Sequence, residues 1–364
     1  MFDPKFTITP KLASILIRIE AIKQEVNIIP ITPQILASLR ESARISMTHY
    51  STMIEGNRLT EEEVALTINN SEHFPNRERD EKEVLGYYVA LDEIEKLATS
   101  KNKLTELQLK KIHGLVMSGG KKRVSATPYR DGQNVIRDSK TRRIVYLPPE
   151  PSDVPVLMKD LIDWINKPSD IPVPLKAGIA HYQYATIHPY YDGNGRTARL
   201  LTTLLLYKNG YGLKGLYSLE EYYANNLMAY YQALTIGPSH NYYFGRAEAD
   251  ITSWIEYFSL GMLSSFETIK HKALKVSKKS RADRSLNLNN LDIKKRKVLT
   301  LFQDREFIAS KDIERSLKVH PRTARNISQQ WVKEDFLIIA DQSKKNRKYV
   351  LNSKYIPILK FIDE

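Results

Sequence analysis

The 364-residue chain contains no cysteine, which excludes disulfide bonds, thiolate metal ligands and a cysteine nucleophile. Long apolar runs are also missing: Leu200–Leu206 includes two threonines and falls far short of the roughly 20 residues that a membrane helix needs. The first ten residues show no basic head followed by an apolar core, so they predict no secretory leader. We therefore expect a cytoplasmic protein without a membrane partner.

Acidic residues are scarce in the last quarter of the chain. Residues 271–364 hold 23 Lys and Arg against 11 Asp and Glu, a net charge of +12, whereas residues 1–270 hold 32 against 31. The total of +13 therefore belongs almost entirely to the C-terminal part. This imbalance favours a polyanion such as nucleic acid as a partner of that part, with a solvated basic surface as the alternative.

The spacing of apolar residues predicts a mainly α-helical fold. Thr32-Pro33 begins one helix and Gly56 ends it, and Thr60 with Glu63 forms a capping box that begins the next. Two apolar stretches, 134–136 and 143–147, flank a polar turn and predict a β-hairpin. Further helices are expected over 81–98, 105–117, 154–165, 175–186, 196–208, 219–234 and 250 to about 276.

The segment that points to chemistry is His188 to Arg199, which reads HPYYDGNGRTAR. Its glycines allow close backbone approach, and successive N–H groups at the start of a helix form an anion-binding site. Arg196 and Arg199 can clamp phosphate, Asp192 is a hard oxygen ligand suited to Mg²⁺, and His188 can act as a general base. Together these residues predict chemistry on a nucleotide phosphate, and a plain turn with a salt-bridged arginine pair is the alternative.

This segment matches His-Pro-[Phe/Tyr]-x-[Asp/Glu]-Gly-Asn-Gly-Arg-x-x-Arg at every fixed position and so resembles the Fic family. Most members transfer AMP from ATP to a protein hydroxyl. The resemblance implies that His188 deprotonates the target Ser, Thr or Tyr, and that Asp192 binds the Mg²⁺ that bridges the α- and β-phosphates. It also implies that Arg196 contacts the β-phosphate and Arg199 the γ-phosphate.

The same resemblance extends the predicted ATP site along the chain. Nearest to the motif arginines it includes Gly193, Asn194 and Gly195 as the anion hole, followed by Thr197 and Ala198. The stretch from Asn225 to Tyr231 resembles an Asn-Arg-x-x-Tyr-Tyr pattern, with Leu227 in place of the Arg. It implies contacts with adenine and ribose from Asn226, Tyr230 and Tyr231. Core aromatics are the alternative for the two tyrosines.

Two further segments resemble parts of the family. The hairpin, with Val135 and Ile136 on its first strand, resembles a flap that pairs with a target segment by strand addition; a plain structural hairpin is the alternative. Residues 51–56 resemble the inhibitory motif [Ser/Thr]-x-x-x-Glu-[Gly/Asn]. This second resemblance implies that Glu55, one helical turn after Ser51, pairs with Arg199 and occupies the guanidinium that should hold the γ-phosphate. A solvent-facing helix pair is the alternative.

Residues 291–364 predict three helices followed by a hairpin and resemble a winged helix-turn-helix. The third helix, which begins at Pro321, would lie in a DNA major groove, and the hairpin turn would contact phosphates. A protein-docking or dimerisation module is the alternative. The expected DNA contacts are Arg322, Thr323, Arg325 and Gln329 on the helix, and Lys344, Lys345 and Arg347 in the turn.

We interpret residues 1–98 as a helical region with an inhibitory helix, 99–276 as a Fic-type catalytic core, 277–290 as a linker and 291–364 as a winged-helix domain. The first hypothesis is an autoinhibited protein adenylyltransferase that modifies another protein or itself. The second is a DNA-binding regulator that uses the Fic fold as a nucleotide sensor, and a third changes the nucleotide donor. His188 and Asp192 favour the first, since a sensor needs no base. The target and a homodimer are left open.

Overall fold

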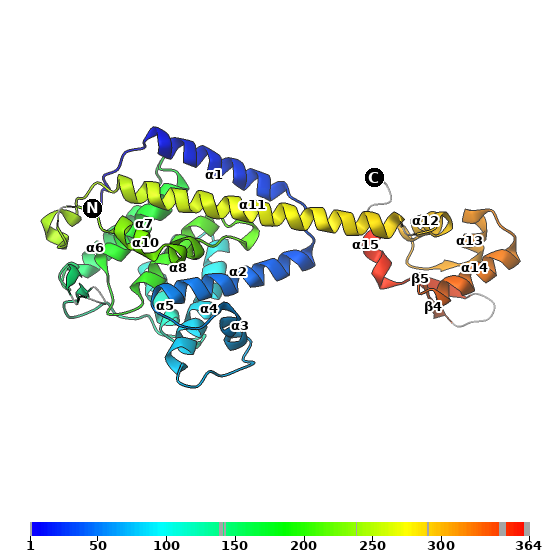
Figure 1. Cartoon of the computed structure of the whole chain (residues 1–364), viewed down its shortest axis with the longest axis horizontal. Coiled ribbons are helices and arrows are strands. Elements are labelled where there is room, and N and C mark those ends of the chain that lie inside the picture. The colour runs from blue at the N-terminus through cyan, green and yellow to red at the C-terminus, as the bar shows by residue number, and fades with distance from the viewer. Residues whose placement is uncertain are drawn as a thin grey trace. The chain divides into compact units, whose positions relative to one another are not determined.

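The computed structural model of the chain divides into two compact units, Met1–Leu274 (unit 1) and Lys275–Glu364 (unit 2). It describes residues 2–137, 141, 143–237, 239–289, 291–341 and 347–359, and of 278–289 and 357–358 the backbone only. The elements that begin in unit 1 are α1 (Pro10–Ile28), α2 (Pro33–Ile54), α3 (Glu61–Ile68), α4 (Glu78–Thr99), α5 (Glu106–Val116), β1 (Ile136–Arg137), β2 (Ile144–Tyr146), α6 (Val154–Asn166), α7 (Val173–Ile187), α8 (Asn194–Lys208), α9 (Glu220–Asn225), α10 (Leu227–Leu234) and α11 (Thr252–Asn289) (Figure 1).

Most helices begin where the sequence predicts, because the capping residues are in place. Thr60 Oγ1 accepts the N–H of Glu63 while Glu63 accepts the N–H of Thr60, which forms the predicted capping box of α3. Thr105 and Gln108 do the same for α5. The mainly α-helical fold with a small hairpin is therefore confirmed.

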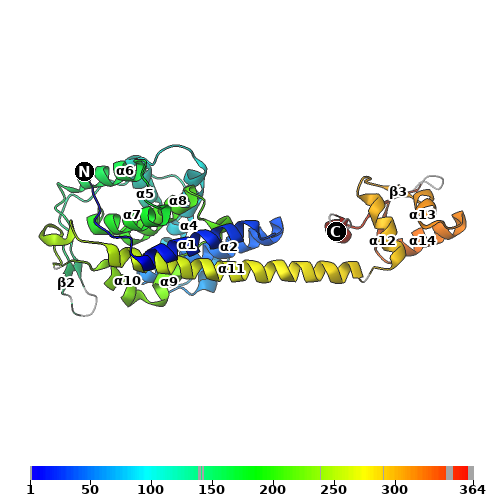
Figure 2. The same ribbon diagram turned by 90° about the horizontal axis from the view of Figure 1, so that it is seen from above.

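Helices α7 and α8 form the centre of unit 1 and lie side by side in Figure 2. Both are buried on nearly every face, as expected for helices enclosed by others. The first half of α11 packs against α7, where Trp254 Nε1 donates to the carbonyl of Gly178 at 2.8 Å. Figures 1 and 2 both place α1 beside α11, and Thr9 Oγ1 donates to Glu256 across this contact at 2.6 Å.

Three features of unit 1 differ from the predictions. The single helix expected over 219–234 is wrong, because Asn226 (φ −142°, ψ 71°) leaves the helical region and separates α9 from α10. The helix end expected near Val276 is also wrong, since α11 continues to Asn289. No glycine or proline interrupts residues 276–289, so nothing in the composition stops the helix. Helix α1 was not predicted.

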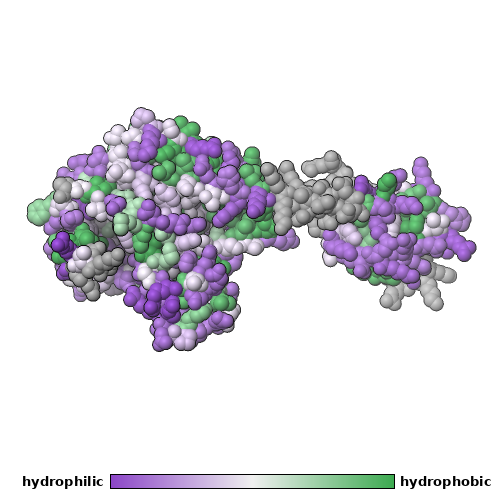
Figure 3. Space-filling model, viewed as in Figure 1, coloured by the Kyte–Doolittle hydropathy of each residue, from purple (hydrophilic) through white to green (hydrophobic). Residues whose placement is uncertain are grey.

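Unit 2 combines helices with a small sheet. Its elements are α12 (Ile293–Leu299), β3 (Ile308–Ala309), α13 (Ser310–Leu317), α14 (Pro321–Lys333), β4 (Leu337–Asp341), β5 (Lys348–Leu351) and α15 (Ile356–Leu359). The antiparallel sheet has the order β3-β5-β4, and Trp331 and Phe336 lie in the core below it. The three helices and the hairpin are as predicted, whereas β3 was not. The face of unit 2 visible in Figure 3 is mostly hydrophilic.

A carboxylate satisfies the backbone at the start of α13. Ser310 is the first helical residue, and the N–H of Ala309 before it donates to Asp312 Oδ2 at 2.8 Å. The carboxylate of Asp312 thus satisfies the backbone N–H of Ala309, which would otherwise be left to water. Among the described helices, none is both long enough and apolar enough to cross a bilayer.

The approach of α4 to α5 gives a stability prediction. A Cβ at Gly86 would lie 2.3 Å from the carbonyl oxygen of Val116, whereas a Cβ at Gly178 would lie 2.8 Å from the ring of Phe258. We expect Gly86→Ala to lower the free energy of unfolding by about 1–3 kcal/mol, because a backbone carbonyl cannot move aside as a ring can. Gly178→Ala should lower it less. Urea unfolding of both variants checks this order, and equal losses would contradict it.

Candidate active site at the start of helix α8

The loop between α7 and α8 has the shape of an anion-binding turn. His188 ends α7 in the left-handed region (φ 52°, ψ 60°), and Gly193 (φ 75°) precedes α8. Asn194 Oδ1 accepts the N–H of Tyr190 at 3.0 Å, and Asn194 Nδ2 donates to the carbonyl of Tyr190 at 2.7 Å. The Asn194 amide therefore holds the loop closed, which leaves the backbone N–H groups of the first turn of α8 to bind an anion.

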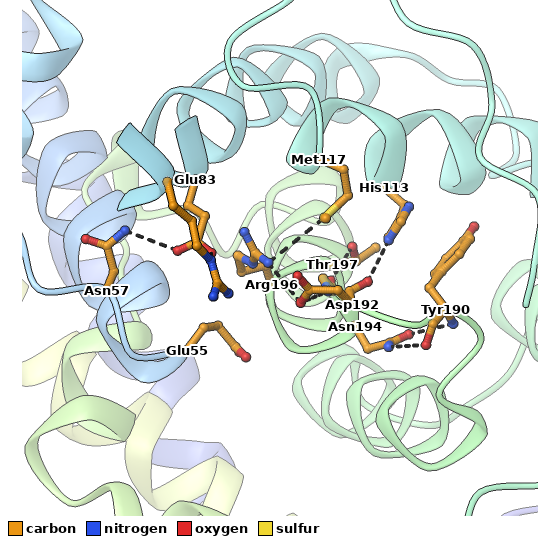
Figure 4. Close-up of polar contacts among 12 residues, drawn as sticks. Glu55, Asn57, Glu83, His113, Met117, Tyr190, Asp192, Asn194, Arg196 and Thr197 are labelled. Atoms are coloured by element: carbon orange, nitrogen blue, oxygen red, sulfur yellow. Dashed lines mark hydrogen bonds and ion pairs between the residues drawn. The ribbon is translucent and has the colours of Figure 1, made fainter. Parts of the chain in front are cut away.

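Helix α5 supports this loop from behind (Figure 4). His113 Nε2 lies 2.9 Å from the carbonyl oxygen of Asp192, so Nε2 carries the proton, and the ring stacks on Tyr190 with centroids 3.5 Å apart. A Cβ at Gly193 would lie 2.8 Å from Met117 Sδ. Glycine is thus required there for space as well as for its positive φ. The sequence analysis missed His113 on α5 and Met117 directly after it, which belong to no motif.

His188 has the form that a general base needs. Its Nδ1 lies 3.3 Å from the carbonyl oxygen of Ala185, so Nδ1 carries the proton and Nε2 keeps its lone pair in the neutral ring. Burial lowers the pKa of His188 to about 4. The imidazole is therefore neutral at pH 7 and able to accept a proton on Nε2.

Asp192 is suited to a cation that takes most of its ligands from phosphate and water rather than from protein side chains. Its side chain is 53% exposed, and Oδ1 accepts from Gly193 N at 2.6 Å and from Arg196 Nη2 at 3.2 Å. Oδ2 has no hydrogen bond to the residues that the structure describes. Those residues also include no group of three or more His, Cys, Asp or Glu side chains that could hold a metal. Asp192 thus fits Mg²⁺ as its one carboxylate ligand, with phosphates and water supplying the others.

The two motif arginines are buried beneath the loop. Arg196 is 1% exposed and Arg199 is 2% exposed. Within the described ranges, Arg196 Nε and Arg199 Nη1 have no hydrogen-bond partner. Each arginine is also paired with a carboxylate, Arg196 with Asp192 and Arg199 with Glu55, so these two N–H groups are the donors left over for a phosphate. Thr197 and Ala198 between them are fully buried, and Thr197 Oγ1 donates to the carbonyl of Gly193 at 2.8 Å.

The expected ion pair between Glu55 and Arg199 is present. Arg199 Nη2 donates to Glu55 Oε1 at 2.8 Å and to the carbonyl of Ser51 at 2.8 Å, and Arg199 Nε donates to Ser51 Oγ at 2.7 Å. A Cβ at Gly195 would lie 2.3 Å from Glu55 Oε1, so the carboxylate lies against the first turn of α8. Burial by itself would lower the pKa of Arg199, but the Glu55 carboxylate raises it above its usual value.

A second set of contacts fixes the turn that carries Glu55. Asn57 is 5% exposed, and its Nδ2 donates to the carbonyl of Asp80 at 2.9 Å and to Glu83 Oε2 at 3.2 Å. Asn57 Oδ1 accepts the N–H of Leu59 at 3.1 Å. These bonds attach the Glu55 turn (residues 55–57) to α4, as Figure 4 shows. No predicted motif included Asn57 in this role.

Two cavities lined by charged residues border the site. One of about 550 Å³ lies beside Asp192 and Arg196 and is also lined by Arg79, Lys82 and Lys121. A smaller cavity of about 250 Å³ lies next to Glu55 and Gly56 and shares Arg79 and Glu83 with the first. The loop and the Glu55 turn are therefore open to a charged ligand from the side of α4.

The residues predicted to surround adenine and ribose lie in different settings. Tyr230 is 2% exposed, and its hydroxyl lies 2.9 Å from His181 Nε2 in the core. Tyr231 is 47% exposed, and its hydroxyl donates to the carbonyl of Ile54, just before Glu55, at 3.2 Å. Asn226 Oδ1 accepts from Ala229 N at 3.1 Å and begins α10. Tyr231 thus contacts the inhibitory segment, while Tyr230 and Asn226 have structural partners.

The predicted flap is a short antiparallel pair, with Ile136 opposite Tyr146 and Arg137 opposite Ile144. Val135 and Ile136 are half-buried, and Ile144 is 46% exposed. Leu147 after β2 pairs with Asn241, whereas the outer edge of β1 has no strand partner among the described residues. Residues 138–140 and 142 lie outside the described part of the chain.

In unit 2 the expected DNA contacts on α14 share one exposed face. They are Arg322, Thr323, Arg325 and Gln329. Ala324, Ser328 and Trp331 form the buried face. Arg347 is half-buried, and Lys344 and Lys345 lie outside the described residues.

Comparison with known proteins agrees with these features. Residues 103–206 match the model of the Fic/DOC family. The protein adenylyltransferase Fic of Aedes aegypti is 31% identical over 184 residues, which are 50% of this chain and 35% of that protein. The protein adenylyltransferase fic-1 of Caenorhabditis elegans is 28% identical over 211 residues, which are 56% of this chain and 40% of that protein. The match thus spans well under half the length of these relatives.

Solved structures show the same fold. A Fic family protein from Desulfovibrio desulfuricans superposes with a TM-score of 0.61 at 22% identity, covering 97% of this chain and 99% of that one. A Fic domain containing signaling protein from Bacteroides thetaiotaomicron has a TM-score of 0.60 at 24% identity, covering 71% of this chain and 97% of that one. The Fic-type helical core predicted from the motif is thereby confirmed.

The buried histidines predict a pH dependence of stability. Burial lowers the pKa of His113 and His188 to about 4 and that of His181 to about 3, against about 6.5 in the unfolded chain. Between these values only the unfolded state takes up the protons, so the free energy of unfolding falls as the pH drops below about 6.5. Each histidine adds a slope of about 1.4 kcal/mol per pH unit.

Urea unfolding from pH 7 to pH 5 measures this slope. His113→Phe keeps the stacking on Tyr190. It should reduce the slope by the contribution of one histidine, about 1.4 kcal/mol per pH unit. A stability that does not change over this pH range would contradict the prediction.

Proposed function

We propose that this chain, whose residues 103–206 form a Fic/DOC domain, transfers AMP from ATP to a hydroxyl group of a protein. The observation that carries the proposal is the convergence of a neutral His188, an exposed Asp192 and two buried arginines with unpartnered N–H groups on the first turn of α8. The names of the relatives, protein adenylyltransferases, support the same reaction. The acceptor is another protein or a second copy of the chain.

In this proposal the first turn of α8 binds the triphosphate. Its backbone N–H groups bind the phosphate oxygens, while Arg196 contacts the β-phosphate and Arg199 the γ-phosphate. His188 Nε2 takes the proton of the target hydroxyl as its oxygen attacks the α-phosphorus, and pyrophosphate leaves. Mg²⁺ on Asp192, when bound, neutralises phosphate charge. Most of the catalytic effect comes from positioning and electrostatic stabilisation.

The outer edge of β1 supplies the position for the target. An extended target segment would add to β1 through backbone hydrogen bonds. Strand addition fixes the target backbone, and the modified side chain is then held at a set distance from His188.

Glu55 makes the enzyme autoinhibited in this scheme. Its carboxylate and the γ-phosphate are both anions that need the same guanidinium of Arg199, so they exclude each other. ATP could still bind while Glu55 remains, but its α-phosphate would be turned away from the attacking hydroxyl. Ser51 would keep its two hydrogen bonds to Arg199 when the carboxylate leaves.

A second function is favoured by one observation on unit 2. Two arginines, a threonine and a glutamine share the exposed face of α14, in a segment of the chain with a net charge of +12. Such a face fits the major groove of DNA, with base edges read by the arginines. We propose DNA binding through α14 beside the transferase activity.

Removal of Glu55 tests the transferase proposal. We expect Glu55→Gly to raise AMP transfer by tenfold or more, because a buried charge-assisted hydrogen bond of about 1.5–3 kcal/mol no longer competes with ATP. His188→Ala in the same background should abolish transfer. Intact mass spectrometry after incubation with ATP and Mg²⁺ detects AMP on the chain itself or on lysate proteins.

Glu62→Gln serves as the control, since Glu62 is an exposed carboxylate on α3. It should transfer no more AMP than the wild type. Glu55→Gln removes the charge but keeps the size, so it should lie between the wild type and Glu55→Gly. If Glu55→Gly modifies nothing, with ATP or any other nucleoside triphosphate, the transferase proposal fails.

DNA binding is tested by fluorescence anisotropy of a mixed-sequence duplex with the full chain at about 50 mM salt. The double variant Arg322→Ala/Arg325→Ala should bind at least tenfold more weakly, because each arginine contact is worth about 1–3 kcal/mol. Arg305→Ala, which removes an arginine paired with Asp312 outside α14, is the control. No binding by the wild type would exclude this second function.

A further inference from the structure

A buried arginine outside every predicted motif joins the catalytic loop to the hairpin. Arg130 lies between α5 and β1 and is 4% exposed. Its Nε donates to the carbonyl of His188 at 3.0 Å, and its backbone N–H donates to the carbonyl of Pro189 at 3.0 Å. One residue therefore holds two consecutive carbonyl groups at the start of the α7–α8 loop.

The rest of the guanidinium holds both ends of the hairpin. Nη1 donates to the carbonyl of Gly132 and to Gln133 Oε1, each at 3.1 Å, just before β1. Nη2 donates to the carbonyl of Pro149, just after β2. Gln133 Nε2 in turn donates to the carbonyl of Pro148 at 3.0 Å. The two strands and the His188 carbonyl are thus tied to one rigid, planar group.

His188 needs such support because its backbone is strained. A non-glycine residue in the left-handed region costs about 1–2 kcal/mol, and here the direction of the imidazole depends on that conformation. On one side the N–H of His188 donates to Tyr184 at 3.0 Å, and on the other side its carbonyl is held by Arg130. Without Arg130 the carbonyl side of the residue loses its hydrogen bond.

Charge does not explain why an arginine stands here. Every side-chain partner given above for Arg130 is a carbonyl or amide oxygen, and burial lowers the pKa of its guanidinium. What the site uses is the fork of N–H donors in one plane, which lysine lacks. The role is therefore geometric.

We propose that Arg130 is a positioning residue that fixes the imidazole of His188 relative to the hairpin, so that a target segment on β1 presents its hydroxyl to Nε2. This proposal rests on the proposed transferase function. Arg130 acts through the backbone of His188 and through the hairpin ends, not on ATP. Its loss should therefore slow transfer to protein without weakening the binding of ATP.

The test compares Arg130→Lys with its parent in the Glu55→Gly background. We expect kcat for protein modification to fall tenfold or more in the folded variant, while the Kd for ATP from calorimetry stays within about twofold. Arg123→Gln changes an exposed arginine of the same connecting segment and should leave kcat unchanged. Equal kcat in Arg130→Lys and its parent would overturn the proposal, as would a parallel loss of ATP affinity.

A second readout does not depend on transfer. NMR titration of the imidazoles, with the His188 signal assigned through His188→Ala, should show the pKa of His188 rising from about 4 toward 6.5 in Arg130→Lys while that of His181 is unchanged. An unchanged His188 titration overturns the positioning role. If Glu55→Gly transfers nothing but His188 shifts as expected, the transferase function fails and the positioning role stands.

A milder variant covers the case in which Arg130→Lys unfolds. Gln133→Ala removes an exposed side chain that accepts from Arg130 and donates to Pro148, so it loosens one hairpin end without opening the core. It should lower kcat by a smaller factor at unchanged Kd for ATP. Unchanged kcat in a folded Gln133→Ala, together with unchanged His188 titration, would overturn the proposal.

Discussion

The arrangement of the site depends on the guanidinium of Arg199, a positive charge that is almost completely removed from water. A buried ion that loses its partner is destabilised by several kcal/mol, so this position requires an anion at all times. Ser51 supplies a hydroxyl and a carbonyl but no charge. In the structure the charge comes from Glu55, and in the proposed reaction it comes from the γ-phosphate. The inhibitory carboxylate and the substrate phosphate therefore meet the same need of Arg199 for a negative charge.

Around that charge, the two central helices provide rigid ends for an otherwise irregular loop. The left-handed conformations of His188 and Gly193 turn the chain by the amount needed to bring the base, the carboxylate and the helix start onto one side. His113 and Asn194 hold the loop through its own carbonyls and N–H groups, and Arg130 holds its entrance. Strain in the loop is thus balanced by side chains that make no contact with a substrate.

The sequence predicts those parts of the molecule that depend on local rules. Capping residues at Thr60 and Thr105 locate helices, and the spacing from His188 to Arg199 locates the loop, because each depends on neighbours within a few residues. The Glu55–Arg199 pair could be predicted only through the family resemblance, since 144 residues separate its members. Two other features carry no local signal. The support by His113 and the bonds of Arg130 are set by tertiary packing, which a single sequence does not reveal, whereas the break at Asn226 has a local signal, an N-cap asparagine, that the prediction of one long helix overlooked.

The attachment of Asn57 to helix α4 determines how the carboxylate of Glu55 can leave its partner. The side chain of Asn57 bonds to the carbonyl of Asp80 and to the N–H of Leu59, so the turn after Glu55 is anchored while the Glu55 side chain is free to rotate. Rotation about the single bonds of one glutamate is enough, and rotations of that kind take place within nanoseconds in side chains that reach solvent. The fraction of molecules that are ready to react would then depend on how often the γ-phosphate replaces the Glu55 carboxylate on Arg199, and not on a slow rearrangement of the fold.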